Sequence, residues 1–221
     1  MPVFRIGTRN VLFIHVPKTG GSSVEKFLAS HAEMALHDRG GRILRPTARA
    51  LFAPGLVMQH FHGEILRTMF PKSYFDYAFT IVRNPETRLV SEYGHAVSRG
   101  RADALLPFSL WARAALRLAR AAPCLGNNHF RAQSDFPCFN AEVFRFEEGL
   151  EAILRQVCLR LGLSPPREIP HERRSPVAVT RVSGPVRALI AHAYASDYAN
   201  FGYAASPAGE SRAPQTSYAT N

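Results

Sequence analysis

Cysteine and long apolar runs are both scarce in this sequence of 221 residues. The three cysteines, Cys124, Cys138 and Cys158, are odd in number and lack metal-ligand spacing, which argues against a disulfide framework and a zinc site. No run approaches the roughly 20 apolar residues of a membrane-spanning helix. The first apolar run, residues 11–16, ends at Pro17 and is too short for a secretory signal peptide. We therefore expect a cytoplasmic protein with no transmembrane segment and no metal.

Acidic residues are also few relative to basic ones. The 27 Lys and Arg residues against 17 Asp and Glu residues give a net charge of +10 with histidine neutral. Lysine occurs only at Lys18, Lys26 and Lys72, so arginine carries most of the positive charge. Arginine is suited to bidentate binding of phosphate, sulfate or carboxylate. The balance favours an anionic partner, such as a nucleotide, an acidic glycan, a nucleic acid or a membrane surface, although biased codon usage produces a similar composition.

Short apolar runs alternate along the chain with segments of helical periodicity, a pattern typical of an α/β fold. Strands are expected at residues 11–16, 78–82 and 143–146. Helices are expected at residues 22–30, 63–70, 105–122, 150–161 and 186–198, and from Pro85 onward. The expected architecture is a P-loop-like three-layer sandwich, in which a central parallel sheet is flanked by helices.

A single domain is expected over residues 1–205, followed by a disordered polar tail at residues 206–221. Residues 37–54 are rich in Arg, Gly and Pro and are expected to form a loop. The helix expected at residues 105–122 carries apolar residues at helical spacing, which predicts a buried face. That face comprises Leu106, Leu110, Ala114 and Leu118.

Residues 17–23, with the sequence PKTGGSS, lead from the first expected strand into the first expected helix. The glycines let the backbone curl so that successive N–H groups face an anion, and the start of a helix adds further donors. Lys18 adds a mobile charge, and Ser22 and Ser23 add hydroxyl groups. In the triphosphatase P-loop, G-x-x-x-x-G-K-[ST], lysine follows the glycines, whereas Lys18 precedes them. The segment predicts a phosphate-binding loop of another type, or an ordinary turn in which serine caps the helix.

A second candidate anion site follows the strand expected at residues 78–82. Arg83 comes directly after this strand, at the edge where ligands collect in open α/β sheets. Ser91 lies about two helical turns further on, with Arg88 between them. Arg83 and Ser91 can converge on one anion if the loop folds back over the strand end. The alternative is that Arg83 is an exposed strand-end charge and Arg88 a solvated helix residue.

Together, the segments FIHVPKTGGSS and FTIVRNPETRLVSEY resemble the sulfotransferases that use 3′-phosphoadenosine 5′-phosphosulfate (PAPS). The likeness is greatest to the carbohydrate branch that includes the heparan sulfate 2-O-sulfotransferases and their soluble bacterial relatives. It extends weakly to residues 128–134, 144–147 and 197–203. The resemblance implies an enzyme that moves the sulfuryl group of PAPS to a hydroxyl, such as that of a carbohydrate, by in-line transfer without a metal.

The resemblance also implies roles for particular residues. The first motif would hold the 5′-phosphosulfate, with Lys18 assisting its cleavage, and Arg83 and Ser91 would hold the 3′-phosphate. The implied phosphosulfate-binding residues are Lys18, Thr19, Gly20, Gly21, Ser22 and Ser23.

Transfer to a hydroxyl requires a base near the acceptor oxygen, and histidine has a suitable pKa of about 6.5. His60 and His62 lie between the two motifs, and the 2-O-sulfotransferase relatives have a His-x-His pair in this region. They are the candidate catalytic bases, His60 slightly ahead of His62, with Glu64 as an alternative base. The other interpretations are that both are surface or capping histidines, or that they bind a metal, for which the sequence offers no third ligand. His15, inside the first strand, is expected to pack in the core or behind the site.

The roles of several other residues are left open. Arg131 and Gln133 line the acceptor pocket or hold His60, or else they pin their own loop. Arg173 and Arg174 lie where relatives place a segment over the nucleotide, and the arginines at residues 39–49 suit an anionic acceptor or a solvated loop. Two other function classes stay open: a Mg²⁺-dependent P-loop kinase or nucleotide hydrolase, and a non-catalytic anion-binding module.

Overall fold

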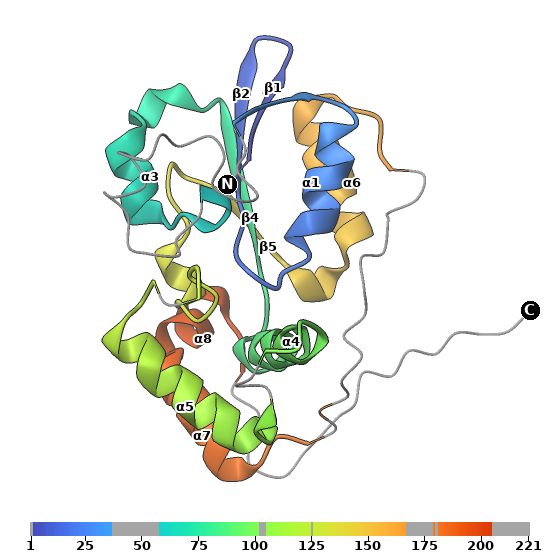
Figure 1. Ribbon diagram of the computed structural model, residues 1–221. Helices are drawn as coiled ribbons and strands as arrows, with labels where there is room; N and C mark the ends of the chain where they lie inside the picture. The colour runs from blue at the N-terminus through green and yellow to red at the C-terminus, as the bar shows by residue number, and fades with distance from the viewer. Residues whose placement is uncertain are drawn as a thin grey trace, which may run out of the picture.

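A five-stranded sheet lies at the centre of the computed structural model (Figure 1). The order across the sheet is β3-β1-β2-β4-β5. The strands span Val3–Ile6 (β1), Arg9–Ile14 (β2), Glu33–Leu36 (β3), Tyr77–Val82 (β4) and Glu142–Arg145 (β5).

The structure describes residues 2–36, 58–101, 105–124, 126–166, 179 and 181–204. The predictions for residues 37–54, for Arg173 and Arg174, and for the tail at residues 206–221 fall outside these ranges.

Only part of the sheet is parallel. Strand β2 pairs in parallel with β4, and β4 with β5, whereas β1 is antiparallel to both β2 and β3. Gly7 and Thr8 join β1 to β2, with Gly7 at a φ of 60°. A turn of two residues can connect only antiparallel neighbours. The expectation of a parallel sheet therefore holds for β2, β4 and β5 and is wrong for the amino-terminal edge, where the sequence pattern does not predict β1 or β3.

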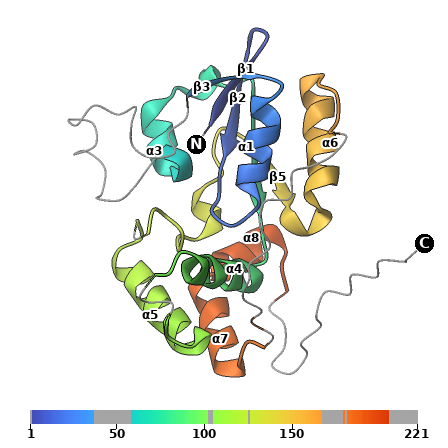
Figure 2. The ribbon, with the colours of Figure 1, turned by 45° about the vertical axis from the view of Figure 1, so that its right-hand side comes forward.

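Successive side chains of β2 enter two separate apolar layers. Val11 and Phe13 pack with α1 (Gly21–Ala29) and α6 (Leu150–Leu161). Leu12 and Ile14 point to the opposite face and pack with α3 (Gly63–Met69). This alternation is the two-residue period of a strand that is buried on both faces. Figures 1 and 2 show the resulting arrangement, with helices on both sides of the sheet.

A third apolar cluster lies beyond the carboxyl ends of the parallel strands (Figure 1). It is formed mainly by α4 (Pro85–Ser98), α5 (Phe108–Ala121) and α7 (Gly184–Ala193), with α8 (Ala195–Phe201) beside them. The single helix expected at residues 186–198 is therefore two helices. They are separated at Tyr194, where the backbone departs from helical geometry with φ −117° and ψ 31°. Among the described residues, short 3-10 turns lie at Met58–His60, Lys72–Tyr74, Gln133–Asp135 and Phe146–Glu148.

Helix α4 begins as its sequence predicts. The Asn84 side chain accepts hydrogen bonds from the amides of Glu86 and Thr87, and Pro85 occupies the first turn. An asparagine cap followed by proline satisfies the first amides and presets the helical φ. The start of α4 is therefore fixed directly after Arg83.

Helix α5 buries a different face from the predicted one. Leu106, Leu110, Ala114 and Leu118 are exposed, whereas Trp111, Ala112, Ala115 and Leu116 are buried. The cause lies in the single tryptophan, whose ring lies 5.2 Å from the Tyr93 ring and 5.7 Å from the Phe130 ring. Burying the large indole stabilises the helix–helix contact more than burying a leucine does, so Trp111 decides how α5 is rotated.

Arg88 is a buried structural residue of α4 and is only 2% exposed. Its Nη2 atom donates to the carbonyl oxygen of Arg131 at 2.7 Å, and its Nη1 atom donates to that of His129 at 3.4 Å. The guanidinium also lies over the Tyr194 ring. The alternative that Arg88 is a solvated helix residue is therefore wrong, because tertiary contacts satisfy its charge.

Asp197 of α8 ties the helical layer to the segment that precedes β5. This fully buried carboxylate accepts hydrogen bonds from the amides of Gln133 at 2.9 Å and Ser134 at 2.8 Å. Leaving a buried amide without an acceptor lowers the stability of the fold. The backbone positions of Gln133 and Ser134 therefore depend on Asp197.

Replacing Asp197 with alanine should lower the free energy of unfolding by about 3 kcal/mol or more, because two amides lose their acceptor. Urea denaturation measures this quantity. The control is Glu151→Ala, which removes a carboxylate that is 64% exposed and pairs with Arg155. That change should cost less than about 1 kcal/mol. Equal losses in the two variants would contradict the role given to Asp197.

Candidate anion-binding site

Three loops meet at the edge where the parallel strands end. Ile14 of β2 lies beside Thr80 of β4, and Val82 of β4 lies beside Arg145 of β5. The segments that follow these strands therefore share one edge of the sheet, where open α/β folds bind their ligands. They are residues 15–20, Arg83 with Asn84, and residues 146–149.

The loop after β2 has the backbone form of an anion-binding nest. Lys18 and Gly20 are in the left-handed region, at φ 68° and 80°, and α1 begins directly afterwards. Gly20 has no side chain with which to cap the first amides of α1. Left-handed residues before a helix turn neighbouring N–H groups toward one point. The Thr19 hydroxyl instead donates to the Val16 carbonyl oxygen at 2.9 Å, so Thr19 offers an anion its amide rather than its side chain.

A buried carboxylate–imidazole pair supports this loop from beneath. His15 Nδ1 lies 2.6 Å from Glu25 Oε1, and Gln59 donates to both carboxylate oxygens at 3.2 Å. A Cβ atom at position 21 would lie 2.1 Å from His15 Nε2, so only glycine fits there. The loop therefore takes its shape from close contact between Gly21 and the His15 ring.

Arg83 connects the loop to α4. Its Nη1 atom donates to the Lys18 carbonyl oxygen at 3.3 Å, and its Nε atom donates to Thr87 Oγ1 at 3.1 Å. The guanidinium also lies 4.5 Å from the Phe146 ring centroid. Gln133 exchanges hydrogen bonds of 2.8 and 2.7 Å with the backbone N–H and carbonyl of Arg83. The Arg83 backbone is therefore clamped while its side chain reaches the loop.

Ser91 lies on the side of α4 that these cations approach. Thr87, Ser91 and His95 are spaced four residues apart, so they share one face of the helix. Arg83 contacts Thr87 at one end of this face. At the other end, burial and then the nearby charge of Lys18 lower the pKa of His95 to about 4.

Positive charge is concentrated around Lys18. Burial lowers the pKa of Lys18; Glu92 opposes this effect, and Arg83 and Arg99 add to it. Burial likewise lowers the pKa of Arg83. Cations whose pKa values fall in this way are stabilised by an added anion. The site therefore suits a ligand with more than one negative charge.

His60 lies directly behind the loop with its Nδ1 atom 3.0 Å from the carbonyl oxygen of His15. A carbonyl oxygen can only accept, so the His60 Nδ1 atom carries a proton and Nε2 has the lone pair. Burial, and then the neighbouring His15 and His129, keep the pKa of His60 well below its ordinary value. His60 is therefore a neutral imidazole whose Nε2 atom carries no proton.

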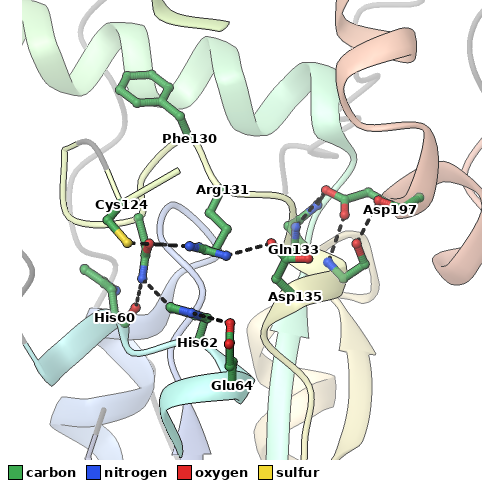
Figure 3. Close-up of polar contacts among 12 residues, drawn as sticks. His60, His62, Glu64, Cys124, Phe130, Arg131, Gln133, Asp135 and Asp197 are labelled. Carbon is green, nitrogen blue, oxygen red and sulfur yellow. Dashed lines mark hydrogen bonds and ion pairs between the residues drawn. The ribbon is translucent and has the colours of Figure 1, made fainter. Parts of the chain in front are cut away.

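His62 has the opposite tautomer. Arg131 Nε donates to Asn128 Oδ1 at 2.9 Å, which directs the Asn128 Nδ2 atom to the His60 carbonyl oxygen at 2.7 Å and to His62 Nδ1 at 3.2 Å. His62 Nδ1 must accept, so its proton lies on Nε2, 3.8 Å from Glu64 Oε2. Figure 3 shows His60, His62 and Arg131 around this contact.

A second carboxylate–imidazole pair lies beside His60. His129 Nδ1 is 2.6 Å from Glu92 Oε2, and the His129 ring packs edge-on against the His60 ring at 5.1 Å. Within the described part of the chain, Glu92 Oε1 is buried without a hydrogen-bond partner and lies 3.7 Å from Arg101 Nη1. Burial raises the pKa of Glu92, but His129, Lys18 and His95 together hold it below its ordinary value. Glu92 is therefore a carboxylate anion close to the positive charge of Lys18.

The structure brings together most of the candidate residues from the sequence. Residues 18–23, Arg83, Ser91 and His60 surround one edge of the sheet, whereas the Glu64 side chain is 82% exposed on α3. Sequence reasoning missed the Glu92–His129 pair and Asn128. The signal available for Glu92 was its spacing of three residues from His95, which puts both on one side of α4.

Two findings concern metal and membrane. Within the residues that the structure describes, no three His, Cys, Asp or Glu side chains are grouped as metal ligands would be. No helix in those residues is long and apolar enough to span a bilayer.

Comparisons with known proteins give a family and one similar structure. A family model described as "Sulfotransferase family" matches residues 2–204. A crystal structure of a sulfotransferase from Alicyclobacillus acidocaldarius is similar, with a TM-score of 0.49 and 17% identity, covering 88% of this chain and 94% of that one. No curated protein matches the sequence.

The support beneath the loop should be visible in the pH dependence of stability. Burial raises the pKa of Glu25, but His15 and Gln59 outweigh it and hold the pKa at about 2, against an ordinary 4.5. The pKa is depressed on folding, so the carboxylate stabilises the protein above pH 4.5 and this contribution is lost as the pH falls toward 2.

Between about pH 5 and pH 3, the wild type should lose about 2 kcal/mol more of its free energy of unfolding than Glu25→Gln does. Urea denaturation at the two pH values measures the difference. Glu33→Gln, at an exposed carboxylate of β3, is the control and should follow the wild type. Parallel pH profiles for the wild type and Glu25→Gln would contradict a charged Glu25 in the folded protein.

Proposed function

The chain belongs to the sulfotransferase family, and from this premise we propose that it transfers the sulfuryl group of PAPS to a hydroxyl of a carbohydrate acceptor. The observation that carries the proposal is the hydrogen bond from Arg83 to the Lys18 carbonyl, because it joins two anion-binding elements of different design. PAPS also carries two separate anionic groups, a 5′-phosphosulfate and a 3′-phosphate.

In this proposal the loop after β2 works as a P-loop-like cradle for the 5′-phosphosulfate. The amides of residues 19–23 and the Lys18 ammonium would surround it, together with the hydroxyl groups of Ser22 and Ser23. Arg83 and Ser91 would hold the 3′-phosphate, since both lie along the Thr87 side of α4. The cluster of cations around Lys18 supports this assignment, because it offers more positive charge than Glu92 alone balances.

The proposed step is an in-line transfer. The acceptor oxygen forms a bond to sulfur while the bond from sulfur to the bridging oxygen of the 5′-phosphosulfate breaks. The bridging oxygen keeps the electron pair and leaves as part of 3′-phosphoadenosine 5′-phosphate (PAP). Lys18 stabilises the charge that develops on this oxygen, and a base removes the acceptor's proton.

We assign the base to His60 rather than His62. The Nδ1–H of His60 is held by the His15 carbonyl, which leaves Nε2 free of a proton. The Asn128 contact puts the proton of neutral His62 on Nε2, so that atom is a donor. The Glu92–His129 pair then has a supporting role, because Glu92 counteracts the effect of burial on Lys18 and so helps to keep it charged.

The carbohydrate acceptor is proposed from the His-x-His pair at His60 and His62, which is similar to that of the 2-O-sulfotransferases. Two rivals make different predictions. A P-loop kinase or hydrolase would bind ATP in a Mg²⁺-dependent manner, and an anion-binding module would bind polyanions without turnover.

Calorimetric titration with PAP in the absence of metal tests the donor site. Lys18→Ala and Arg83→Ala should each weaken PAP binding by about 10-fold to 100-fold, since each removes a charge-assisted contact. Lys72→Ala, at an exposed lysine of a 3-10 turn, is the control and should bind like the wild type.

ATP with Mg²⁺ is titrated in parallel. Equal or tighter binding of ATP that requires Mg²⁺ would overturn the PAPS proposal in favour of a kinase or hydrolase. A folded wild type that binds neither nucleotide would favour the anion-binding module.

The assignment of the base predicts a split between two matched variants. His60→Asn should lower kcat by about 10² or more while leaving PAP affinity unchanged, because asparagine keeps a donor for the His15 carbonyl but removes the base. His62→Asn should lower kcat less than about tenfold. Transfer of labelled sulfate from PAPS to oligosaccharide acceptors measures kcat. A larger loss in His62→Asn than in His60→Asn would reverse the assignment.

A further inference from the structure

The outward face of α5 carries a row of exposed leucines. Leu106, just before the helix, is 42% exposed, and Leu110 and Leu118 are 53% and 57% exposed. Ala114, also exposed, lies between Leu110 and Leu118. Residues four apart lie one above the other along a helix, so these side chains form one continuous apolar stripe. The opposite side of α5 is already buried through Trp111.

A stripe of positive charge runs beside the apolar stripe. Arg113, Arg117 and Arg120 are all exposed on α5. The sequence contains no acidic residue between Asp103 and Asp135. The outer surface of α5 is therefore both apolar and cationic, with no carboxylate of its own to neutralise it.

The position of α5 leaves this surface accessible. In Figures 1 and 2, α5 lies at the outer edge of the helical layer. The helix packs through its other side against α4 and α7. Among the described residues, the one exposed leucine outside the segment 105–118 is isolated: Leu159 on α6 is 78% exposed and has no comparable row around it. Clustered apolar exposure on one element marks an interaction surface, whereas single exposed residues do not.

We propose that α5 docks on an anionic membrane surface. The helix would lie in the plane of the interface, with the leucine stripe among the upper acyl chains and the arginines at the lipid phosphates. Amphipathic helices with basic residues beside an apolar face bind in this way, and each basic residue near an anionic surface adds to the attraction. The proposal does not depend on sulfuryl transfer.

Charge selects the membrane over a second copy of the chain. Two α5 faces brought together would place six arginines in one contact with no carboxylate from the helices between them, and like charges repel. Anionic headgroups instead supply the missing negative charge. At 14 residues, α5 is too short to cross a bilayer, which is consistent with docking in the interface.

Co-sedimentation of the full chain with lipid vesicles tests the proposal. The wild type should bind vesicles that contain about one third phosphatidylglycerol at least about tenfold more tightly than vesicles of phosphatidylcholine alone. The double variant L110Q/L118Q should lose at least about tenfold in affinity for the anionic vesicles, since two inserted side chains become polar. Leu159→Gln, the matched control on α6, should bind within about twofold of the wild type.

The contribution of the arginine stripe is tested with a second variant and its matched control. R113Q/R117Q should reduce the preference for anionic vesicles, whereas R155Q/R160Q on α6 should leave it unchanged. All substituted residues are at the surface, and unchanged circular dichroism confirms that each variant is folded.

Three results would overturn the proposal. The first is a wild type that does not sediment with anionic vesicles. The second is binding that R113Q/R117Q and R155Q/R160Q weaken equally while L110Q/L118Q does not, which would show attraction by net charge alone. The third is a dimer in light scattering that L110Q/L118Q abolishes without any vesicle binding, which would assign the face to a second copy.

Discussion

The parallel pairing of β2 with β4 decides where the two central cations of the site lie. It puts Lys18 and Arg83, which are far apart in the sequence, at one edge of the sheet, close enough for a direct hydrogen bond. Arg83 lowers the pKa of Lys18, and burial lowers the pKa of Arg83, so the two cations are held together by the surrounding structure rather than by mutual attraction. The cap of α4 at Asn84 and the clamp by Gln133 supply that restraint.

Two of the histidines at this edge, His15 and His60, are arranged to stay neutral. His15 and His60 are buried, and burial is the main cause of their lowered pKa values. Carbonyl and carboxylate acceptors orient both rings through Nδ1. Neutral rings do not add to the positive charge of Lys18 and Arg83, so the cations stay available to an anionic ligand. The same neutrality leaves His60 with the lone pair that a base requires.

Local signals in the sequence predict much of the fold. The strand before Pro17, the helix after Gly20 and the start of α4 at Pro85 depend on neighbouring residues, and the structure has each of them. The two glycines and Lys18 predict the loop for the same reason. The roles of these residues toward a ligand stay predictions.

The sequence does not predict the side-chain contacts between segments that are far apart along the chain. Asn128 fixes the tautomer of His62 across 66 residues, and Glu92 meets His129 across 37. Periodicity gives the faces of α5 but not which face is buried, because Trp111 outweighs the leucine stripe only in the context of Tyr93 and Phe130. The antiparallel edge of the sheet is missed because β1 and β3 span only four residues each.

The proposed donor site is tested most directly by measuring how PAP, adenosine 5′-phosphate and adenosine 3′-phosphate bind to the wild type, Lys18→Ala and Arg83→Ala. If the loop holds the 5′ group and Arg83 holds the 3′-phosphate, Arg83→Ala should lose most of the preference for PAP over adenosine 5′-phosphate, and Lys18→Ala should keep it. Conversely, Lys18→Ala should lose most of the preference for PAP over adenosine 3′-phosphate. Equal weakening of all three nucleotides in both variants would contradict two separate phosphate sites.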